Sequence, residues 1–253
     1  MRVLITNDDG IASAGLKALA DAAAARGHEI FISAPSSQCS ANSQHITLTA
    51  PLIVHKRSWP GAEAYAVDGT PSDCVRIAPC LTDKPFDFCL SGINHGENAG
   101  AAVYYSGTCA AAREAATLHI PSMAVSIMRD ETDEMRAALA RMAVEYMEKL
   151  RDVPLPPFGF FNLNAPALPP DQWKPLRVCP LSQAYYLDTY ARRVNPYGTT
   201  YFWLDSNDTS GLPMEPIEPG SDYACLKDGH VTFTIVGAYA NHNDLLKEKM
   251  QEI

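Results

Sequence analysis

Short apolar segments alternate with helical segments through the first half of the chain, and this order constrains the fold more than any other feature. The expected strands are residues 3–5, 29–32, 87–90 and 122–126, and the expected helices are residues 14–25, 106–118 and 135–150. Strands that are separated by helices form a mostly parallel sheet with right-handed crossovers. We therefore expect an α/β fold in which Pro35 stops the second strand and residues 91–100 form a loop after the third.

The composition changes near residue 153. Prolines at 154, 156, 157, 166, 169, 170 and 175 exclude a regular helix over this stretch. We expect residues 177–178, 198–204 and 230–236 to be extended and residues 243–251 to be helical. The interpretation is a single α/β domain over residues 1–253. Its core reaches about residue 165, and a C-terminal antiparallel arm with a terminal helix covers about 166–253. The residues alone leave open whether this arm packs on another subunit.

Charge and hydropathy exclude several classes of protein. The formal net charge of −9 argues against a surface for a nucleic-acid polymer, which needs a basic stripe. No apolar run approaches the ~20 residues of a membrane span, and the N-terminal residues are typical of a strand rather than a signal peptide. The seven cysteines are odd in number and show neither C-x-x-C nor zinc-ligand spacing. We expect them to be mostly buried, reduced thiols in the cytoplasm.

Two adjacent carboxylates, Asp8 and Asp9, directly follow the first expected strand. This places them at the carboxyl edge of the sheet, where open α/β proteins bind their ligands. No basic residue lies between Arg2 and Lys17. Two carboxylates held together repel each other unless a cation compensates their charge. The pair favours a bound cation, and the motif alone leaves open a solvated turn in which Gly10 adopts a positive φ.

Three further polar segments are expected at the same edge: residues 34–43, 91–100 and 105–108. The Ser40 hydroxyl and the Asn94 carbonyl oxygen would join the two carboxylates in an oxygen ligand set, which Mg²⁺ prefers. Ser106, Gly107 and Thr108 open a helix, whose N-terminal N–H groups and dipole favour a bound anion. Each of these side chains could instead be a turn residue or a helix N-cap.

Together these segments resemble the SurE (survival protein E) family of 5′/3′-nucleotidases. The order and spacing of residues 3–11, 34–40, 69–75, 91–98 and 106–108 carry the resemblance, and residues 162–164, 195–203 and 221–232 agree more loosely. The resemblance implies a Rossmann-like, three-layer α/β/α core with a C-terminal arm exchanged between subunits of a homodimer or homotetramer. Three places depart from the family pattern: Ser36 stands where Asp is common, Cys39 where a basic residue is usual, and the dipeptide Ile235-Val236 where Pro-Leu is usual.

The resemblance also implies an activity and its residues. The reaction would be metal-dependent hydrolysis of nucleoside 5′- and 3′-monophosphates to nucleoside and phosphate, with short polyphosphate as a further substrate. One divalent ion per subunit, Mg²⁺ or Mn²⁺, would be held by four ligands: Asp8, Asp9, Ser40 and Asn94. The phosphate pocket would be lined by Asn98, Ser106, Gly107 and Thr108. Asp8 and Asp9 would also be the catalytic residues, one of them as a base or as a nucleophile.

Two other functions stay open on the sequence. Haloacid-dehalogenase-like phosphatases also place carboxylates after a first strand, but in an Asp-x-Asp spacing, whereas Asp8 and Asp9 are adjacent. A non-catalytic regulatory module would bind a nucleotide without turning it over. The chain lacks G-x-x-x-x-G-K-[ST] and G-x-G-x-x-G, so the glycine-rich loop is no P-loop and a dinucleotide site is disfavoured.

Overall fold

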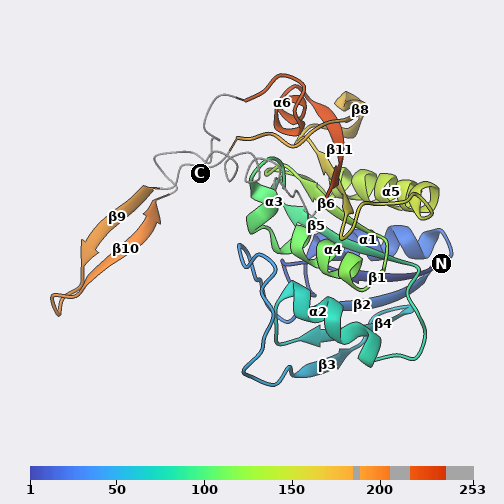
Figure 1. Cartoon of the computed structure of the whole chain (residues 1–253), viewed down its shortest axis with the longest axis horizontal. Coiled ribbons are helices and arrows are strands. Elements are labelled where there is room, and N and C mark those ends of the chain that lie inside the picture. The colour runs from blue at the N-terminus through green and yellow to red at the C-terminus, as the bar shows by residue number, and fades with distance from the viewer. Residues whose placement is uncertain (185–188, 206–216, 238–253) are drawn as a thin grey trace, which may run out of the picture.

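The computed structural model describes residues 1–184, 189–205 and 217–237. A nine-stranded sheet forms its centre, with helices on both faces (Figure 1). The strand order is β3 (Val54–Arg57), β4 (Ala62–Val67), β2 (Glu29–Pro35), β1 (Arg2–Thr6), β5 (Phe88–His95), β6 (Ser122–Ile127), β7 (Phe160–Ala165), β11 (His230–Val236) and β8 (Lys174–Val178). Of the neighbouring pairs, only β3 with β4 and β7 with β11 are antiparallel. The mostly parallel α/β fold is thus confirmed.

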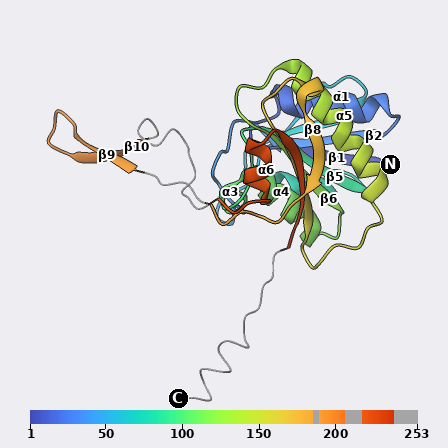
Figure 2. The same cartoon turned by 90° about the horizontal axis from the view of Figure 1, so that it is seen from above.

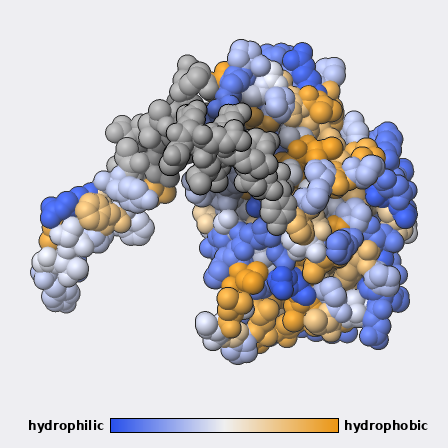
Figure 3. Space-filling view, viewed as in Figure 1, coloured by the Kyte–Doolittle hydropathy of each residue, from blue (hydrophilic) through white to orange (hydrophobic). Residues whose placement is uncertain are grey.

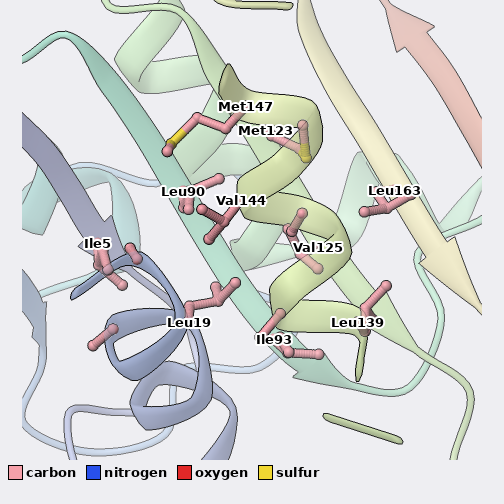
Figure 4. Packing of buried hydrophobic residues seen from close by; sticks show 14 of the residues in the cluster. Ile5, Leu19, Leu90, Ile93, Met123, Val125, Leu139, Val144, Met147 and Leu163 are labelled. Atoms are coloured by element: carbon pink, nitrogen blue, oxygen red, sulfur yellow. The ribbon is translucent and has the colours of Figure 1, made fainter. Parts of the chain in front are cut away.

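Strand alternation divides the core into two apolar layers. Val3 and Ile5 of β1 face a cluster that includes residues of α1 (Ala14–Ala25) and α5 (Asp133–Leu150), such as Leu19 and Leu139. Figure 4 shows Ile5, Leu19 and Leu139 packed between the sheet and the two helices. Leu4 faces the opposite layer, beneath α2 (Pro71–Ile77) and α4 (Gly107–Thr117). Figure 2 shows the two helical layers edge on.

Hydroxyl side chains mark the start of five helices. In five helices the N-cap side chain accepts a hydrogen bond from a backbone N–H of the first turn, and these caps are Ser13, Thr70, Ser106, Thr132 and Ser221. Such caps satisfy N–H groups that have no partner inside the helix. The fifth belongs to the short helix α6 (Asp222–Lys227). The helix expected at residues 14–25 is confirmed at both ends, and α4 begins immediately after its expected cap Ser106.

The first-half strands differ from expectation in length and number. β2 continues through Pro35 rather than stopping before it, because a parallel pairing with β4 extends to Val67. β5 runs to His95, so residues 91–95 are strand and not loop; after an irregularity, Asn94 pairs with Ser126 on β6. Strands β3 and β4 and the short helix α3 (Ala102–Tyr105) were not foreseen; nor was β7, which lies in the second half of the chain.

The second half of the chain supplies strands to the central sheet, which corrects the expected boundary between core and arm. β11 pairs with β7 and β8 pairs with β11, because Val231 and Phe233 bury their side chains in the main core. An antiparallel hairpin of β9 (Thr189–Val194) and β10 (Thr200–Asp205) is what remains of the arm, and it lies away from the sheet (Figures 1 and 2). The expected terminal helix at 243–251 lies outside the described residues.

Two expectations about composition can be compared with the structure. All seven cysteines are free thiols, and five of them are buried, as the sequence predicts. Within the described residues, no helix is both long enough and apolar enough to cross a membrane.

Candidate active site

Four segments that are far apart in the sequence meet at the carboxyl end of β1. The Thr108 hydroxyl donates a hydrogen bond to Asp8 Oδ1, which joins the start of α4 to the end of β1. The Cys39 N–H donates to the Asp8 carbonyl oxygen at 2.7 Å, and this brings in the loop after β2. The His95 N–H lies 3.3 Å from Asp9 Oδ2 and brings in the end of β5. The edge predicted from the strand order is therefore the edge at which the candidate residues gather.

Asn7 shapes the turn that carries the two carboxylates. Its Nδ2 donates to the Gly10 carbonyl oxygen at 3.0 Å and to Ser13 Oγ at 2.6 Å, while its Oδ1 accepts from the Gly10 N–H at 3.2 Å. Gly10 has the positive φ, +95°, that the turn reading anticipates. Asp8, however, is only 4% exposed, so it is not the solvated side chain of a simple surface turn.

Asp8 lies directly against the first turn of α4. A Cβ added to Gly107 would stand 2.7 Å from the Asp8 Cβ, closer than two such atoms can approach. Glycine at this position therefore lets the helix N-terminus reach the carboxylate. Ser106 caps the helix by accepting the Cys109 N–H at 3.0 Å, and Thr108 is fully buried. The predicted segment Ser106–Thr108 is thus brought to Asp8, at the positive end of the helix dipole.

The electrostatics of the pair favour a positively charged ligand. Burial raises the pKa of Asp8 to about 6; the charge of Asp9 raises it too, against the hydrogen bond from Thr108. Burial likewise raises the pKa of Asp9 above its usual value, partly opposed by the hydrogen bond from the His95 N–H. Among the described residues, neither carboxylate forms an ion pair with Lys or Arg. Two partly desolvated and uncompensated carboxylates are the arrangement that a cation stabilises.

The other two predicted metal ligands lie on adjoining segments. Ser40 is exposed on the loop after β2, and its Oγ accepts from Gln38 Nε2 at 2.9 Å. Asn94 is half-buried near the end of β5, and its Nδ2 donates to the Gly96 carbonyl oxygen at 2.7 Å. That bond leaves the Asn94 amide oxygen available as a ligand. Because all four donors are oxygens, the set fits a hard divalent cation. The described part of the chain has no cluster of three or more His, Cys, Asp or Glu that could hold a metal.

The loop that carries Ser40 is fastened at points beyond it. The Ser43 N–H and hydroxyl donate to the carbonyl oxygens of Tyr105 and Tyr104, at 3.0 and 2.7 Å. The Thr47 N–H and hydroxyl donate to the Asp73 carboxylate at 2.9 and 2.7 Å. The exposed Ser40 is therefore held between α3 and α2 by its neighbours and not by its own contacts.

The predicted phosphate residue Asn98 lies in the loop after β5. It is 5% exposed, and its Nδ2 donates to Ser126 Oγ at 2.8 Å. Its backbone contacts two asparagines of β7, Asn162 and Asn164. Nothing in the local sequence pattern pointed to Ser126, since it stands at the end of an apolar strand.

Sequence reasoning also missed a His–Glu pair beside Asp9. His95 Nδ1 lies 2.8 Å from the buried Glu131 carboxylate, which also accepts from Arg136 at 2.8 Å. The His95 side chain is 57% exposed. Glu131 is remote from His95 in the sequence, so the pair itself could not be predicted. The only local sign was that His95 directly follows the candidate ligand Asn94.

Comparison with known proteins identifies the family. The family model described as Survival protein SurE matches residues 3–188. The chain belongs to the SurE family. A 5′-nucleotidase SurE of Desulfitobacterium hafniense is 37% identical to it over 260 residues, covering 100% of this chain and 97% of the relative. A 5′-nucleotidase SurE of Geotalea daltonii is 38% identical over 256 residues, covering both chains fully.

A solved SurE structure has the same overall fold. The crystal structure of the SurE protein from Aquifex aeolicus superposes with a TM-score of 0.81 at 29% sequence identity, and the match covers 100% of both chains. The family resemblance inferred from the segments around Asp8, Asn94 and Ser106 is therefore confirmed.

One departure from the SurE pattern has a visible structural consequence. Cys39 is half-buried, and its Sγ lies 3.6 Å from the Gly69 carbonyl oxygen. Burial raises the pKa of the Cys39 thiol, and the charge of Asp8 raises it further. The position where a basic residue is usual in the family pattern is thus occupied here by a neutral thiol.

Proposed function

We propose that this phosphoric monoester hydrolase cleaves nucleoside 5′-monophosphates to nucleoside and phosphate with one divalent metal ion per subunit. The observation that carries the proposal is the buried Asp8–Asp9 pair, uncompensated by Lys or Arg among the described residues, against the N-terminus of α4. The 5′-nucleotidase activity named for its SurE relatives gives the reaction class.

The residues divide the work of phosphoryl transfer. A bound Mg²⁺ or Mn²⁺ would polarise a phosphoryl oxygen and lower the pKa of a water molecule. Asp8, Asp9, Ser40 and Asn94 would hold it. The N–H groups at the start of α4 and the Asn98 amide bind the phosphoryl oxygens, where negative charge must be stabilised. Thr108 fixes the Asp8 carboxylate through its hydroxyl, so the carboxylate and the helix N-terminus keep one mutual orientation.

The substrate range and the cellular setting belong to the same proposal. Nucleoside 3′-monophosphates and short polyphosphate present the same phosphoryl oxygens to the site, and we include them as secondary substrates. The seven free thiols support a cytoplasmic protein, because thiols persist in reducing compartments.

A phosphate-release assay tests the proposal directly. The chain is incubated with nucleoside 5′- and 3′-monophosphates or short polyphosphate, with Mg²⁺ or Mn²⁺, and with excess chelator as the control. We expect release with metal and none with chelator. Tight nucleotide binding without release would support a regulatory module instead. Trapping of an aspartyl adduct by beryllofluoride would support a haloacid-dehalogenase-like mechanism.

We further propose that the β9–β10 hairpin packs on a neighbouring subunit of a homodimer or homotetramer. Its exposed apolar side chains range from 39% to 93% exposure and are Tyr190, Val194, Tyr197, Tyr201, Phe202, Trp203 and Leu204. Figure 3 shows both hydrophobic and hydrophilic residues on the surface of the projecting hairpin. An isolated two-stranded hairpin is marginally stable, and exposed apolar patches mark interaction surfaces. Light scattering on the full chain and on Trp203→Ser tests this; a wild-type monomer would contradict it.

A further inference from the structure

Two buried asparagines stand out on β7, where all other side chains are apolar. Phe161 and Leu163 point into the core cluster shared with α1 and α5. Since side chains alternate along a strand, Asn162 and Asn164 point to the opposite face. Each is 1% exposed. A buried amide is tolerated only where its polar atoms find partners, so these partners should reveal what the pair is for.

Both asparagines are bonded to the backbone of one residue, Asn98. The Asn98 N–H donates to Asn164 Oδ1 at 2.8 Å. The Asn98 carbonyl oxygen accepts from Asn162 Nδ2 at 2.8 Å and from Asn164 Nδ2 at 3.2 Å. Asn164 therefore pairs with both backbone groups of Asn98, as a neighbouring strand would. Although Asn98 lies in a loop, both its N–H and its carbonyl oxygen have hydrogen-bond partners, as those of a residue in a sheet do.

The side chain of Asn98 is held from the same sheet. Its Nδ2 donates to Ser126 Oγ, and Ser126 on β6 is the register partner of Asn164 on β7. On its other side Ser126 is the register partner of Asn94 on β5. A polar row, Asn94–Ser126–Asn164, thus crosses three parallel strands near their carboxyl ends. It connects the proposed metal ligand Asn94 with the proposed phosphate ligand Asn98.

We propose that Asn162 and Asn164 are positioning residues that aim the Asn98 amide at the phosphoryl group of the substrate. The proposal rests on the proposed function, in which Asn98 lines the phosphate pocket. A carboxamide has two N–H donors, and Ser126 occupies one, so the second is free to donate to an anion. A backbone that is bonded at both N–H and C=O keeps this donor in place before substrate arrives, and such preorganisation favours binding of the transition state. The two asparagines do not touch the substrate themselves.

A double-mutant cycle separates positioning from a general contribution to folding. Asn98→Ala, Asn164→Ala and the double variant are compared in the full chain. Binding of inorganic phosphate in the presence of Mn²⁺ is measured by calorimetry, and phosphate release gives kcat and KM. We expect each single variant to raise the Kd for phosphate and the KM about tenfold or more, the range seen for groups that orient a ligand residue. The double variant should be no worse than Asn98→Ala, because Asn164 acts through Asn98.

Two further variants keep the test decisive. Thr232→Val is the matched control. Thr232 lies on β11 as the register partner of Asn164 and is buried to the same extent. Its hydroxyl has no hydrogen-bond partner among the described residues. It should leave the Kd for phosphate unchanged. Ser126→Ala frees the Asn98 amide while leaving both asparagines in place, and it should raise the Kd even if Asn164→Ala does not fold.

Two outcomes would overturn the positioning role. The first is that the fold-increases in the Kd for phosphate of the two single variants multiply in the double variant. The second is that both Asn164→Ala and Ser126→Ala lower the Tm but leave the Kd for phosphate unchanged. A wild-type chain that neither binds phosphate nor releases it would instead overturn the proposed function on which the role rests.

Discussion

The two halves of the candidate site are built in opposite ways. Asp8, Gly107 and Thr108 are buried where the end of β1 meets the start of α4. Ser40 and His95 are exposed, one on the loop after β2 and the other at the end of β5. In the buried half each group directly contacts another group of the site. In the exposed half the His95 backbone N–H bonds to Asp9, whereas Ser40 is held through its neighbours. The Asp8 carboxylate thus lies where water is largely excluded, whereas Ser40 and His95 are open to solvent.

Mutations in the buried half should reduce activity more than mutations in the exposed half. Interactions between charges are stronger where water is excluded, and exposed contacts are weakened by water and salt. A small displacement in the buried half also moves the helix N-terminus relative to the carboxylate. The difference between the halves can be tested from its strongest consequence to its weakest.

The largest effect should come from Asp8→Asn, which keeps the shape and removes the charge. We expect kcat to fall by about 10²-fold or more, as for loss of a metal-site group. Because burial raises the pKa of Asp8, the carboxylate destabilises the folded state increasingly as pH rises from its unfolded pKa to about 6. The metal-free variant should therefore be at least as stable as the wild type at pH 7. Phosphate release and thermal unfolding with chelator measure both, and an active variant would contradict the assignment.

Gly107→Ala should be nearly as damaging, although it adds a single methyl group. The new Cβ would stand 2.7 Å from the Asp8 Cβ and 3.1 Å from Pro71 Cγ, so Asp8 and the helix start must separate. A displacement of this kind in a reacting geometry can cost up to about 10²-fold in rate. Alanine is otherwise the better helix former. Unchanged kcat with a raised Tm would show that the close approach has no role in catalysis.

Ser40→Ala tests the exposed half and should have a smaller effect. Loss of one solvent-exposed oxygen ligand should lower kcat/KM by about tenfold or less, equivalent to roughly one hydrogen bond. The loss should diminish at higher metal concentration. Ser37→Ala, an exposed hydroxyl of the same loop, is the matched control and should behave as the wild type. If Ser40→Ala were as inactive as Asp8→Asn, the distinction between the two halves would fail.

The weakest effect on activity is expected for Asp73→Asn, which acts on the fastening of the Ser40 loop. Burial alone would raise the pKa of Asp73, but hydrogen bonds from Thr47 and Thr70 outweigh it and hold the pKa below its usual value. The carboxylate therefore stabilises the fold above the unfolded pKa of about 3.9, and this contribution is lost as pH falls through the folded pKa.

We expect Asp73→Asn to lower the free energy of unfolding by about 1–3 kcal/mol at pH 7, because it disturbs buried hydrogen bonds. The deficit should shrink below about pH 4, where the wild-type carboxyl becomes protonated. Denaturant titrations at several pH values measure the difference. If the loss in free energy of unfolding did not depend on pH, the charge of Asp73 would have no part in holding the loop that carries Ser40.

The part of the site that could be predicted is encoded locally. Asp8 and Asp9 are adjacent and follow a strand, and Ser106–Thr108 carries its own helix-start signal, so neighbouring residues suffice to identify both. The parallel order of strands then explains why they meet. The SurE fold followed from the same segments and was confirmed by the family match. The ligand and pocket assignments of individual residues stay predictions.

What escaped prediction depends on contacts between distant residues. The two asparagines of β7 share a partner, Asn98, that lies far away in the sequence, so their role could not be recognised from the residues of the strand. The pairing of His95 with Glu131 is hidden for the same reason. The extended segments at β8 and β11 were assigned to an arm and not to the sheet, because they follow the proline-rich region and no crossover helix precedes them.

The antiparallel pairing of β7 with β11 has a consequence for the way the chain is made. A ribosome delivers β1 to β7 well before β11, so the growing sheet ends at β7 until the later strand is synthesised. An open strand edge invites pairing with other chains. Asn162 and Asn164 are bonded to Asn98, which is already available at that stage. The order of synthesis therefore leaves the β7 edge without its antiparallel partner until β11 has been made.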